Sequence, residues 1–348
     1  MNEFKISICT VCMNRLHHIK QTLPLNIEDN KDYQNLEFII LDYNSSDGLN
    51  TWIKSEMSHY IQSGILKYYR TEEPLFFDRT HSRNLMFKLA TGDVLSNVDA
   101  DNFTGKGFAR YLNDEFVKNP DIYVVADTKK RFYFLRNAFG RFACNKQNYL
   151  LVGGMDETMK SYGSETLDLY ERFEQQGLEE VVIKNINFLK AISHDDSERI
   201  ENEYFLKNIH SLFIRFKSFE LSEVIFLFKD NYYEACSILP EKEELHLPAT
   251  LKPGSLNKGK WIQRGIDIVL EQKIFTITEN GLQGTGYDEF YYKITDPIFL
   301  QNVAKNYSFI VNNAKLRHNK LKKNIKVNSL SFGLGNVTLN FDTSISII

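Results

Sequence analysis

The sequence lacks a glycine-rich phosphate loop, has few cysteines and contains no long apolar run. Neither G-x-G-x-x-G nor G-x-x-x-x-G-K-[ST] occurs in its 348 residues, which argues against a dinucleotide-dependent dehydrogenase and a P-loop NTPase. Four cysteines are too few for a disulfide framework, and Cys9 and Cys12 have no second Cys/His pair at zinc spacing, so we expect buried thiols. No window approaches the roughly 18 uncharged apolar residues of a membrane span.

An excess of charge of one sign is also lacking. The 42 basic and 45 acidic residues give a formal net charge of −3, so the whole chain does not look like a nucleic-acid binder. Hydrophobic residues at 43% and charged residues at 25% are ordinary for a globular protein, and the length suggests two domains of roughly 150 residues each. Because Glu3 and Lys5 interrupt the first residues, we see no signal peptide and expect a cytoplasmic protein.

The first part of the chain alternates strand-like and helix-like segments. The strand-like segments are residues 4–11, 36–41, 65–69, 93–98 and 122–126, and the helix-like segments are residues 15–27, 46–61, 80–89 and 106–117. We expect Pro24 to kink or end the first helix early. This alternation predicts an α/β fold with a mixed, mostly parallel sheet and helices on both faces. Ligands of such folds bind beyond the carboxyl ends of the strands.

The pattern is less regular after residue 129. We predict short strands at 131–135 and 181–183, an amphipathic helix at 164–176, an apolar helix at 211–228 and a linker or extended excursion at 238–260. Short strands and one helix near 298–323 follow, which indicates a smaller α+β C-terminal region.

Charged side chains follow the predicted strands where a ligand is expected. Asp99 and Asp101 come directly after the fourth strand, and two carboxylates at this spacing can share one Mg²⁺ or Mn²⁺ with a bound diphosphate. Asp42 ends the second strand and can accept a hydrogen bond from a nucleobase or ribose, or it is a turn aspartate bonded to its own backbone. Arg83 can reach diphosphate oxygens, or it lies on a solvated helix face.

Several motifs occur together in a recognisable order. Thr10, Asn14-Arg15, LDYNSSDG, THSRNLMFKLATGD and VDAD resemble the nucleotide-sugar half of GT-A-fold glycosyltransferases, in particular the inverting family 2 group. Residues 150–173 resemble the GG-[FM]-D-E…[WY]-G-x-E-D segment of its galactosyltransferase and N-acetylgalactosaminyltransferase branch, which includes bacterial capsule and chondroitin-type polymerases. The resemblance covers residues 1–199.

The resemblance implies a role for each matching residue. Nucleotide-sugar binding falls to Thr10, Asn14, Arg15, Asp42, Arg83, Asp99, Gly154 and Tyr162. Among them Arg83 approaches the diphosphate, Gly154 belongs to a tight turn beside the sugar, and Tyr162 is a platform for a sugar ring. The implied ligands of Mn²⁺ or Mg²⁺ are Asp99, Asp101 and His194, with Asp101 the more direct of the two aspartates.

One position departs from the family pattern. The usual Glu-Asp pair is Glu165-Thr166 here, and a threonine cannot deprotonate a sugar hydroxyl at neutral pH. We therefore expect Glu165 or Asp168 to be the catalytic base. The two carboxylates are three residues apart in a predicted helix and share one face.

The resemblance predicts a metal-dependent inverting transferase that moves a hexose or N-acetylhexosamine from a UDP-sugar to a glycan or lipid-linked glycan, in polysaccharide biosynthesis. Residues 1–210 would be the transferase domain, divided at 128 into nucleotide-sugar and acceptor halves, and residues 211–348 an accessory region. A non-catalytic sugar-nucleotide-binding protein is one alternative. A nucleotidyltransferase is the other, although Arg15 alone does not supply its basic loop.

A local excess of positive charge lies near the C-terminus. Residues 305–326 contain seven basic side chains and no acidic one. This segment is a solvated helix face, or it is a patch for peripheral contact with the inner face of an anionic membrane.

Overall fold

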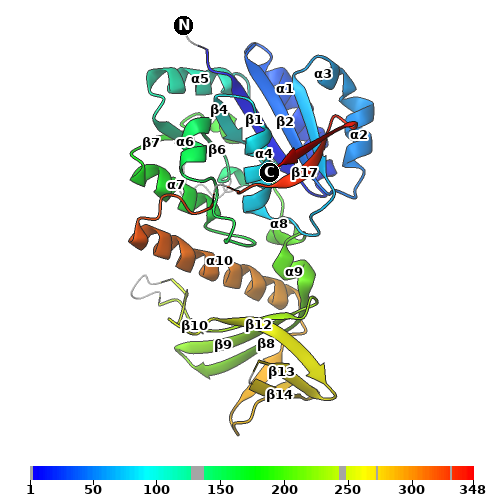
Figure 1. Ribbon diagram of the computed structural model, residues 1–348, viewed down its shortest axis with the longest axis vertical. Helices are drawn as coiled ribbons and strands as arrows, with labels where there is room; N and C mark the ends of the chain where they lie inside the picture. The colour runs from blue at the N-terminus through cyan, green and yellow to red at the C-terminus, as the bar shows by residue number, and fades with distance from the viewer. Residues whose placement is uncertain (1–2, 127–136, 243–247, 272, 330) are drawn as a thin grey trace. The chain divides into compact units, whose positions relative to one another are not determined.

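A computed structural model describes residues 3–126, 137–242, 248–271, 273–329 and 331–348 (Figure 1). The chain divides into two compact units. The first contains Met1–Met159, Glu165–Asp196 and His318–Ile348, and the second contains Lys160–Ser164 and Ser197–Arg317. The last part of the predicted accessory region therefore belongs with the first unit, and the predicted boundary at residue 210 lies inside the second.

The first unit is built on a mixed sheet with the strand order β18-β17-β3-β2-β1-β4-β6-β5-β7. Its strands are β1 (Ile6–Cys12), β2 (Leu36–Tyr43), β3 (Leu66–Thr71), β4 (Val94–Asn97), β5 (Ile122–Val125), β6 (Phe142–Asn145), β7 (Glu179–Val182), β17 (Gly335–Leu339) and β18 (Thr343–Ile347). Strands β3, β2, β1 and β4 are parallel, whereas β6 and β17 run antiparallel to their neighbours. The predicted fold class, with its mostly parallel sheet, is confirmed.

Helices cover both faces of this sheet. They are α1 (Leu16–Asn30), α2 (Leu49–Glu56), α3 (Ser58–Gln62), α4 (Arg79–Leu89), α5 (Phe108–Lys118), α6 (Lys146–Leu151), α7 (Glu165–Gln175) and the short 3-10 helix η2 (Ile186–Leu189). Neighbouring residues of β1 belong to two different cores, with Ile8 in one and the buried Cys9 in the other. Burial on both faces explains why the strands read as continuous apolar runs.

Pro24 does not end the first helix, so that alternative of the prediction was wrong. Helix α1 continues through it to Asn30. Two buried side chains hold the helix on either side of the proline. The Thr22 hydroxyl donates to the Ala100 carbonyl at 2.7 Å, and the Asn26 amide donates to the Asn102 carbonyl at 3.0 Å. We infer that these tertiary hydrogen bonds offset the helical bond that proline cannot make.

The second unit contains a closed antiparallel barrel. Its strands are β8 (Ile209–Ser218), β9 (Leu221–Phe228), β10 (Tyr232–Leu239), β12 (Asn257–Arg264), β13 (Asp267–Leu270), β14 (Lys273–Ile277), β15 (Gly281–Gln283) and β16 (Phe290–Lys293). The ring closes because β9 pairs with both β8 and β10. The short strand β11 (Thr250–Leu251) adds to β10. The remaining helices are α8 (Asp196–Ile200), α9 (Tyr204–Asn208) and α10 (Pro297–Lys322).

The predicted helix at 211–228 is wrong, because these residues form the hairpin β8–β9. Leu212 and Val224 belong to the core that contains α10 residues, whereas Phe213 and Ile225 belong to the core of the barrel. Both faces of the hairpin are buried, so the polar alternation of a half-exposed strand is missing. The predicted linker at 238–260 is also wrong in part, because it contains β11 and the start of β12.

Other predicted elements have different outcomes. The strand predicted at 131–135 lies outside the described residues. The long helix near the C-terminus is confirmed as α10. Within the described chain, each helix is too short or too polar to cross a bilayer.

Candidate functional site

Arg83 links two acidic segments at the carboxyl end of β4. Its Nη2 atom lies 3.2 Å from Asp99 Oδ1, and its Nη1 atom lies 3.4 Å from Glu165 Oε1. Arg83 comes from α4, Asp99 follows β4, and Glu165 begins α7. The Arg83 and Glu165 side chains are 5% and 9% exposed, so little water competes for their contact, whereas the Asp99 side chain is 33% exposed. This arginine therefore holds two carboxylates from distant parts of the sequence beside one guanidinium.

The environment of Asp99 favours its anionic form. Burial raises the pKa of this carboxyl, whereas the Arg83 charge and a hydrogen bond from Asn97 lower it. The lowering effects are larger together, so the pKa lies below its usual value. Gly140 leaves the space that the carboxylate needs. A Cβ atom at that position would lie 2.4 Å from Asp99 Oδ2. Any side chain at residue 140 would displace Asp99.

Asp101 and His194 meet although 93 positions separate them. His194 Nε2 lies 2.9 Å from Asp101 Oδ2, and the other carboxylate oxygen accepts from the Asn102 amide at 2.9 Å. Backbone pairing brings the two segments together, because Asn102 bridges to Ala191 and the Ile192 N–H donates to the Asp101 carbonyl at 2.8 Å.

This pair suits a divalent cation. Neighbouring ligand atoms in an octahedral shell with bonds of about 2.1 Å lie about 3 Å apart, close to the distance found here. A carboxylate oxygen with an imidazole nitrogen is a suitable donor set for Mn²⁺. Among the described residues, the ligand atoms of Asp99, Asp101 and His194 do not all lie within 4.8 Å of one another. The structure therefore brings together two of the three predicted metal ligands, while Asp99 faces Arg83.

Arg141 is a site residue that the sequence interpretation missed. It immediately precedes β6, is fully buried, and donates to Asn102 Oδ1 at 3.1 Å. Burial lowers its pKa to about 10, although the charges of Asp99 and Asp101 oppose this shift. It therefore remains a cation at neutral pH. Its Nε and Nη1 atoms have no hydrogen-bond partner within the described part of the chain.

Asp42 is completely buried at the end of β2. Its carboxylate accepts hydrogen bonds from the Tyr68 hydroxyl at 2.6 Å, from Arg70 Nη1 at 2.7 Å and from the Ser45 backbone N–H at 2.7 Å. Both oxygens are therefore engaged within the protein. The bond to the Ser45 N–H is the backbone contact expected if Asp42 is a turn aspartate.

The other predicted nucleoside residues fix the loops around Asp42. The Thr10 hydroxyl donates to the Val98 carbonyl at 2.7 Å and so ties β1 to the end of β4. Asn14 adopts a left-handed φ of 56°, and its side-chain oxygen accepts from the Ser46 N–H at 2.8 Å. Arg15 donates to the Asn14 carbonyl at 2.9 Å. The bond between Asn14 and Ser46 therefore joins the loops that follow β1 and β2.

Gly154 makes a close approach that only glycine permits. Its φ is 68°, and a Cβ atom would lie 2.4 Å from Asn84 Oδ1. The Asn84 side chain bonds both the N–H and the carbonyl of Met155, which fixes the turn. Arg172 holds the same turn through the Gly154 carbonyl at 2.7 Å.

The two candidate bases lie in different environments. Asp168 is 1% exposed; one oxygen pairs with Arg172 Nε at 2.8 Å, and the other accepts from the Asn319 amide at 2.9 Å. Glu165 lies at the first turn of α7 beside Arg83. The contacts of Asp168 are those of a structural residue.

Tyr162 belongs to the second compact unit. Its carbonyl accepts from the Ser308 hydroxyl at 2.9 Å, and the Lys305 ammonium lies 5.6 Å from the centre of its ring. The other predicted site residues belong to the first unit.

Comparison with known proteins points to sugar transfer. Residues 7–154 match the model of glycosyl transferase family 2, and residues 122–195 match the model of the N-terminal domain of galactosyltransferase. These matches support a family 2 glycosyltransferase domain of GT-A type, in agreement with the predicted fold class. No curated protein matches the chain.

Solved structures of low identity resemble part of the chain. A mannosyltransferase from Pyrobaculum calidifontis in complex with GDP-Man and Mn²⁺ has 17% identity and a TM-score of 0.45, covering 53% of this chain and 56% of that one. TarS 1–349 of S. aureus has 15% identity and a TM-score of 0.42, covering 52% and 58%. This chain thus spans little more than half the length of either structure.

Proposed function

We propose that this protein is a metal-dependent inverting glycosyltransferase that moves a hexose or N-acetylhexosamine from a UDP-sugar to a hydroxyl of a glycan. The observation that carries the proposal is Arg83, which bridges Asp99 and Glu165 at the strand end that also presents Asp101 and His194. The match of residues 7–154 to glycosyl transferase family 2 supports it.

Asp101 and His194 are the residues that would hold Mn²⁺ or Mg²⁺. Such a cation, when bound, stabilises the negative charge of a departing diphosphate. Arg83 and Arg141 add fixed positive charge on the protein side. Because both guanidiniums are buried, their interaction with an anion is screened less than it would be in water.

Glu165 is the proposed base. It lies in the first turn of α7, and Arg83 orients its carboxylate. It takes the proton from the acceptor hydroxyl as that oxygen attacks the anomeric carbon, the bond from sugar to diphosphate breaks, and UDP leaves. General-base assistance of this kind contributes roughly 10²–10⁴ in rate.

The match to a galactosyltransferase domain favours UDP-galactose or UDP-N-acetylgalactosamine as donor. We propose a growing bacterial glycan or lipid-linked glycan as acceptor and a cytoplasmic location, with residues 305–326 in peripheral contact with the inner face of the membrane.

A panel of UDP-sugars with candidate acceptors tests the proposal. We expect UDP release that depends on the donor and increases when an acceptor is added. Glu165→Gln should lower kcat at least about 10²-fold with little change in donor affinity. Absence of UDP release with every donor, while donor binding persists, would instead indicate a non-catalytic sugar-nucleotide-binding protein.

A further inference from the structure

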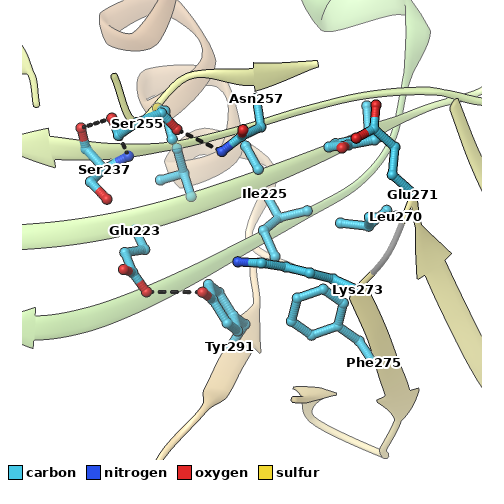
Figure 2. A pocket seen from close by; sticks show the side chains of 14 residues that line it. Glu223, Ile225, Ser237, Ser255, Asn257, Leu270, Glu271, Lys273, Phe275 and Tyr291 are labelled. Carbon is cyan, nitrogen blue, oxygen red and sulfur yellow. Dashed lines mark hydrogen bonds between the residues drawn. The ribbon is translucent and has the colours of Figure 1, made fainter. Parts of the chain in front are cut away.

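The barrel of the second unit has a core of buried side chains and a pocket that borders it. Aromatic and aliphatic side chains form the core, among them Phe213, Leu227, Trp261, Ile268 and Leu282. The pocket has a volume of about 280 Å³ and is lined in part by other members of the same core (Figure 2). Barrels of eight strands have an interior just wide enough to be filled by side chains or to hold one small ligand. This barrel does both.

Small side chains, namely Ala235, Ser237 and Ser255, are among those that line the pocket. Ala235 of β10 pairs with Asn257 of β12, and Tyr233 pairs with Gly259. A Cβ atom at Gly259 would lie 2.5 Å from Glu271 Oε1 and 3.0 Å from the Tyr233 ring, so glycine leaves room for that carboxylate. The larger Phe275 and Tyr291 also line the pocket (Figure 2).

The pocket combines aromatic surface with available polar groups. Within the described residues, no hydrogen bond satisfies the Ser237 hydroxyl, Asn257 Oδ1, the Glu271 carboxylate or the Lys273 ammonium. In Figure 2 the Lys273 side chain extends across the pocket toward the side of Tyr291. Donors and acceptors thus surround an apolar floor that contains Ile225, Leu270 and Phe275.

The pocket and its immediate surroundings carry charges of both signs. Glu223 accepts from the Tyr291 hydroxyl at 2.9 Å and pairs with Arg215 at 3.3 Å and with Lys217 at 3.7 Å. Burial and the neighbouring Glu223 raise the pKa of the Tyr291 phenol, which therefore stays protonated. Glu271 and Lys273 contribute one charge of each sign. Because carboxylates are interspersed with the cations, a neutral ligand is favoured over a nucleotide or another multiply charged anion.

We propose that this pocket binds a neutral saccharide of one or two rings. A sugar ring has an apolar C–H face that can lie against an aromatic side chain, while its hydroxyls can bond with Ser237, Asn257, Glu271 and Lys273. The volume is just below the roughly 300–1,000 Å³ of pockets for drug-sized ligands, which suits a ligand this small. The expectation that the saccharide is a unit of the acceptor glycan rests on the proposed function, whereas the pocket chemistry stands without it.

Saturation-transfer NMR on the full chain tests this site. The probes are the methyl glycosides of galactose and N-acetylgalactosamine, with glucuronate and galactosamine as charged comparisons. We expect both neutral glycosides to bind with millimolar affinity and more tightly than either charged sugar. Lys273→Ala and Asn257→Ala should each weaken binding at least about fivefold, through loss of a hydrogen bond. Lys260→Ala is the matched control, because Lys260 is exposed on β12 and does not line the pocket.

Two further variants separate this site from the transferase site. Asp101→Asn should leave binding of the methyl glycosides in the barrel unchanged, whereas Lys273→Ala should leave the rate of UDP release without added acceptor unchanged. Failure of UDP release alone would refute the proposed function but not the barrel site. The barrel proposal is overturned if the neutral glycosides fail to bind, if they bind wild type and both pocket variants equally, or if a charged sugar binds more tightly.

Discussion

Substitution of Asp168 by asparagine should destabilise the protein while leaving the chemistry largely intact. Asp168 and Arg172 form an ion pair in which each side chain is 1% exposed. The remaining contacts of this pair are the Asn319 amide and the carbonyls of Val152 and Gly154. Removing the carboxylate charge leaves Arg172 buried without its counter-ion.

The magnitude follows from this burial. Removing one partner of a buried ion pair costs roughly 3–5 kcal/mol, because the other charge stays uncompensated. One kcal/mol shifts the melting temperature of a domain of 150–250 residues by roughly 2–4 °C, so the first unit should melt about 6–20 °C lower. Glu165→Gln is the comparison variant. It should melt much closer to wild type. Arg83 loses the charge of Glu165 in this variant but keeps Asp99 as its counter-ion.

Thermal melts followed by circular dichroism, with UDP release measured below the transition, distinguish the two carboxylates. We expect Asp168→Asn to melt early but retain turnover at low temperature, and Glu165→Gln to stay folded but lose turnover. The reasoning is refuted if Asp168→Asn melts like wild type, or if it abolishes turnover with the fold intact while Glu165→Gln does not.

Three further predictions concern stability and membrane contact. Burial raises the pKa of Glu37, but hydrogen bonds from Lys67, Ser7 and Thr91 lower it to about 2. Wild type should therefore be about 3 kcal/mol more stable than Glu37→Gln at pH 7. Urea titrations should show that this difference disappears as the pH falls from about 4.5 toward 2. Gly154→Ala should lower the melting temperature more than Gly177→Ala, because both glycines have a positive φ but only Gly154 is crowded, by Asn84; equal losses would contradict this reasoning. If residues 305–326 contact a membrane, the protein should co-sediment with anionic vesicles at low salt more than with neutral ones. Each basic residue near the surface should contribute about 1 kcal/mol to the binding free energy. Equal sedimentation with both kinds of vesicle would reject the contact.

The first half of the fold was predictable because its elements carry local signals. The strands β1 to β5 are short apolar runs, and the helices between them carry apolar stripes, so both the alternation and the parallel sheet follow from the sequence. The hairpin β8–β9 was mistaken for a helix because burial on both of its faces removed the period of two. The return of β17 to pair with β3 depends on contacts between distant residues, which local patterns do not encode.

The candidate site shows the same division. The position of Asp99 and Asp101 at a strand end was predictable from the order of elements. Their different orientations were not, because Arg83 and Gly140 determine where the Asp99 carboxylate lies. The structural engagement of Asp168 depends on Asn319, about 150 positions away. Arg141 was missed because a single arginine in an irregular stretch has no spacing that marks it.

The central claim is that Asp101 and His194 hold a divalent cation that glycosyl transfer requires. Its most direct test is the rate of UDP release from UDP-galactose and UDP-N-acetylgalactosamine in Mn²⁺, followed after addition of EDTA and again after Mn²⁺ is restored. We expect release to stop in EDTA, to return with Mn²⁺, and to be at least about 10²-fold slower in a folded Asp101→Asn variant. An unchanged rate of UDP release in EDTA would contradict the central claim.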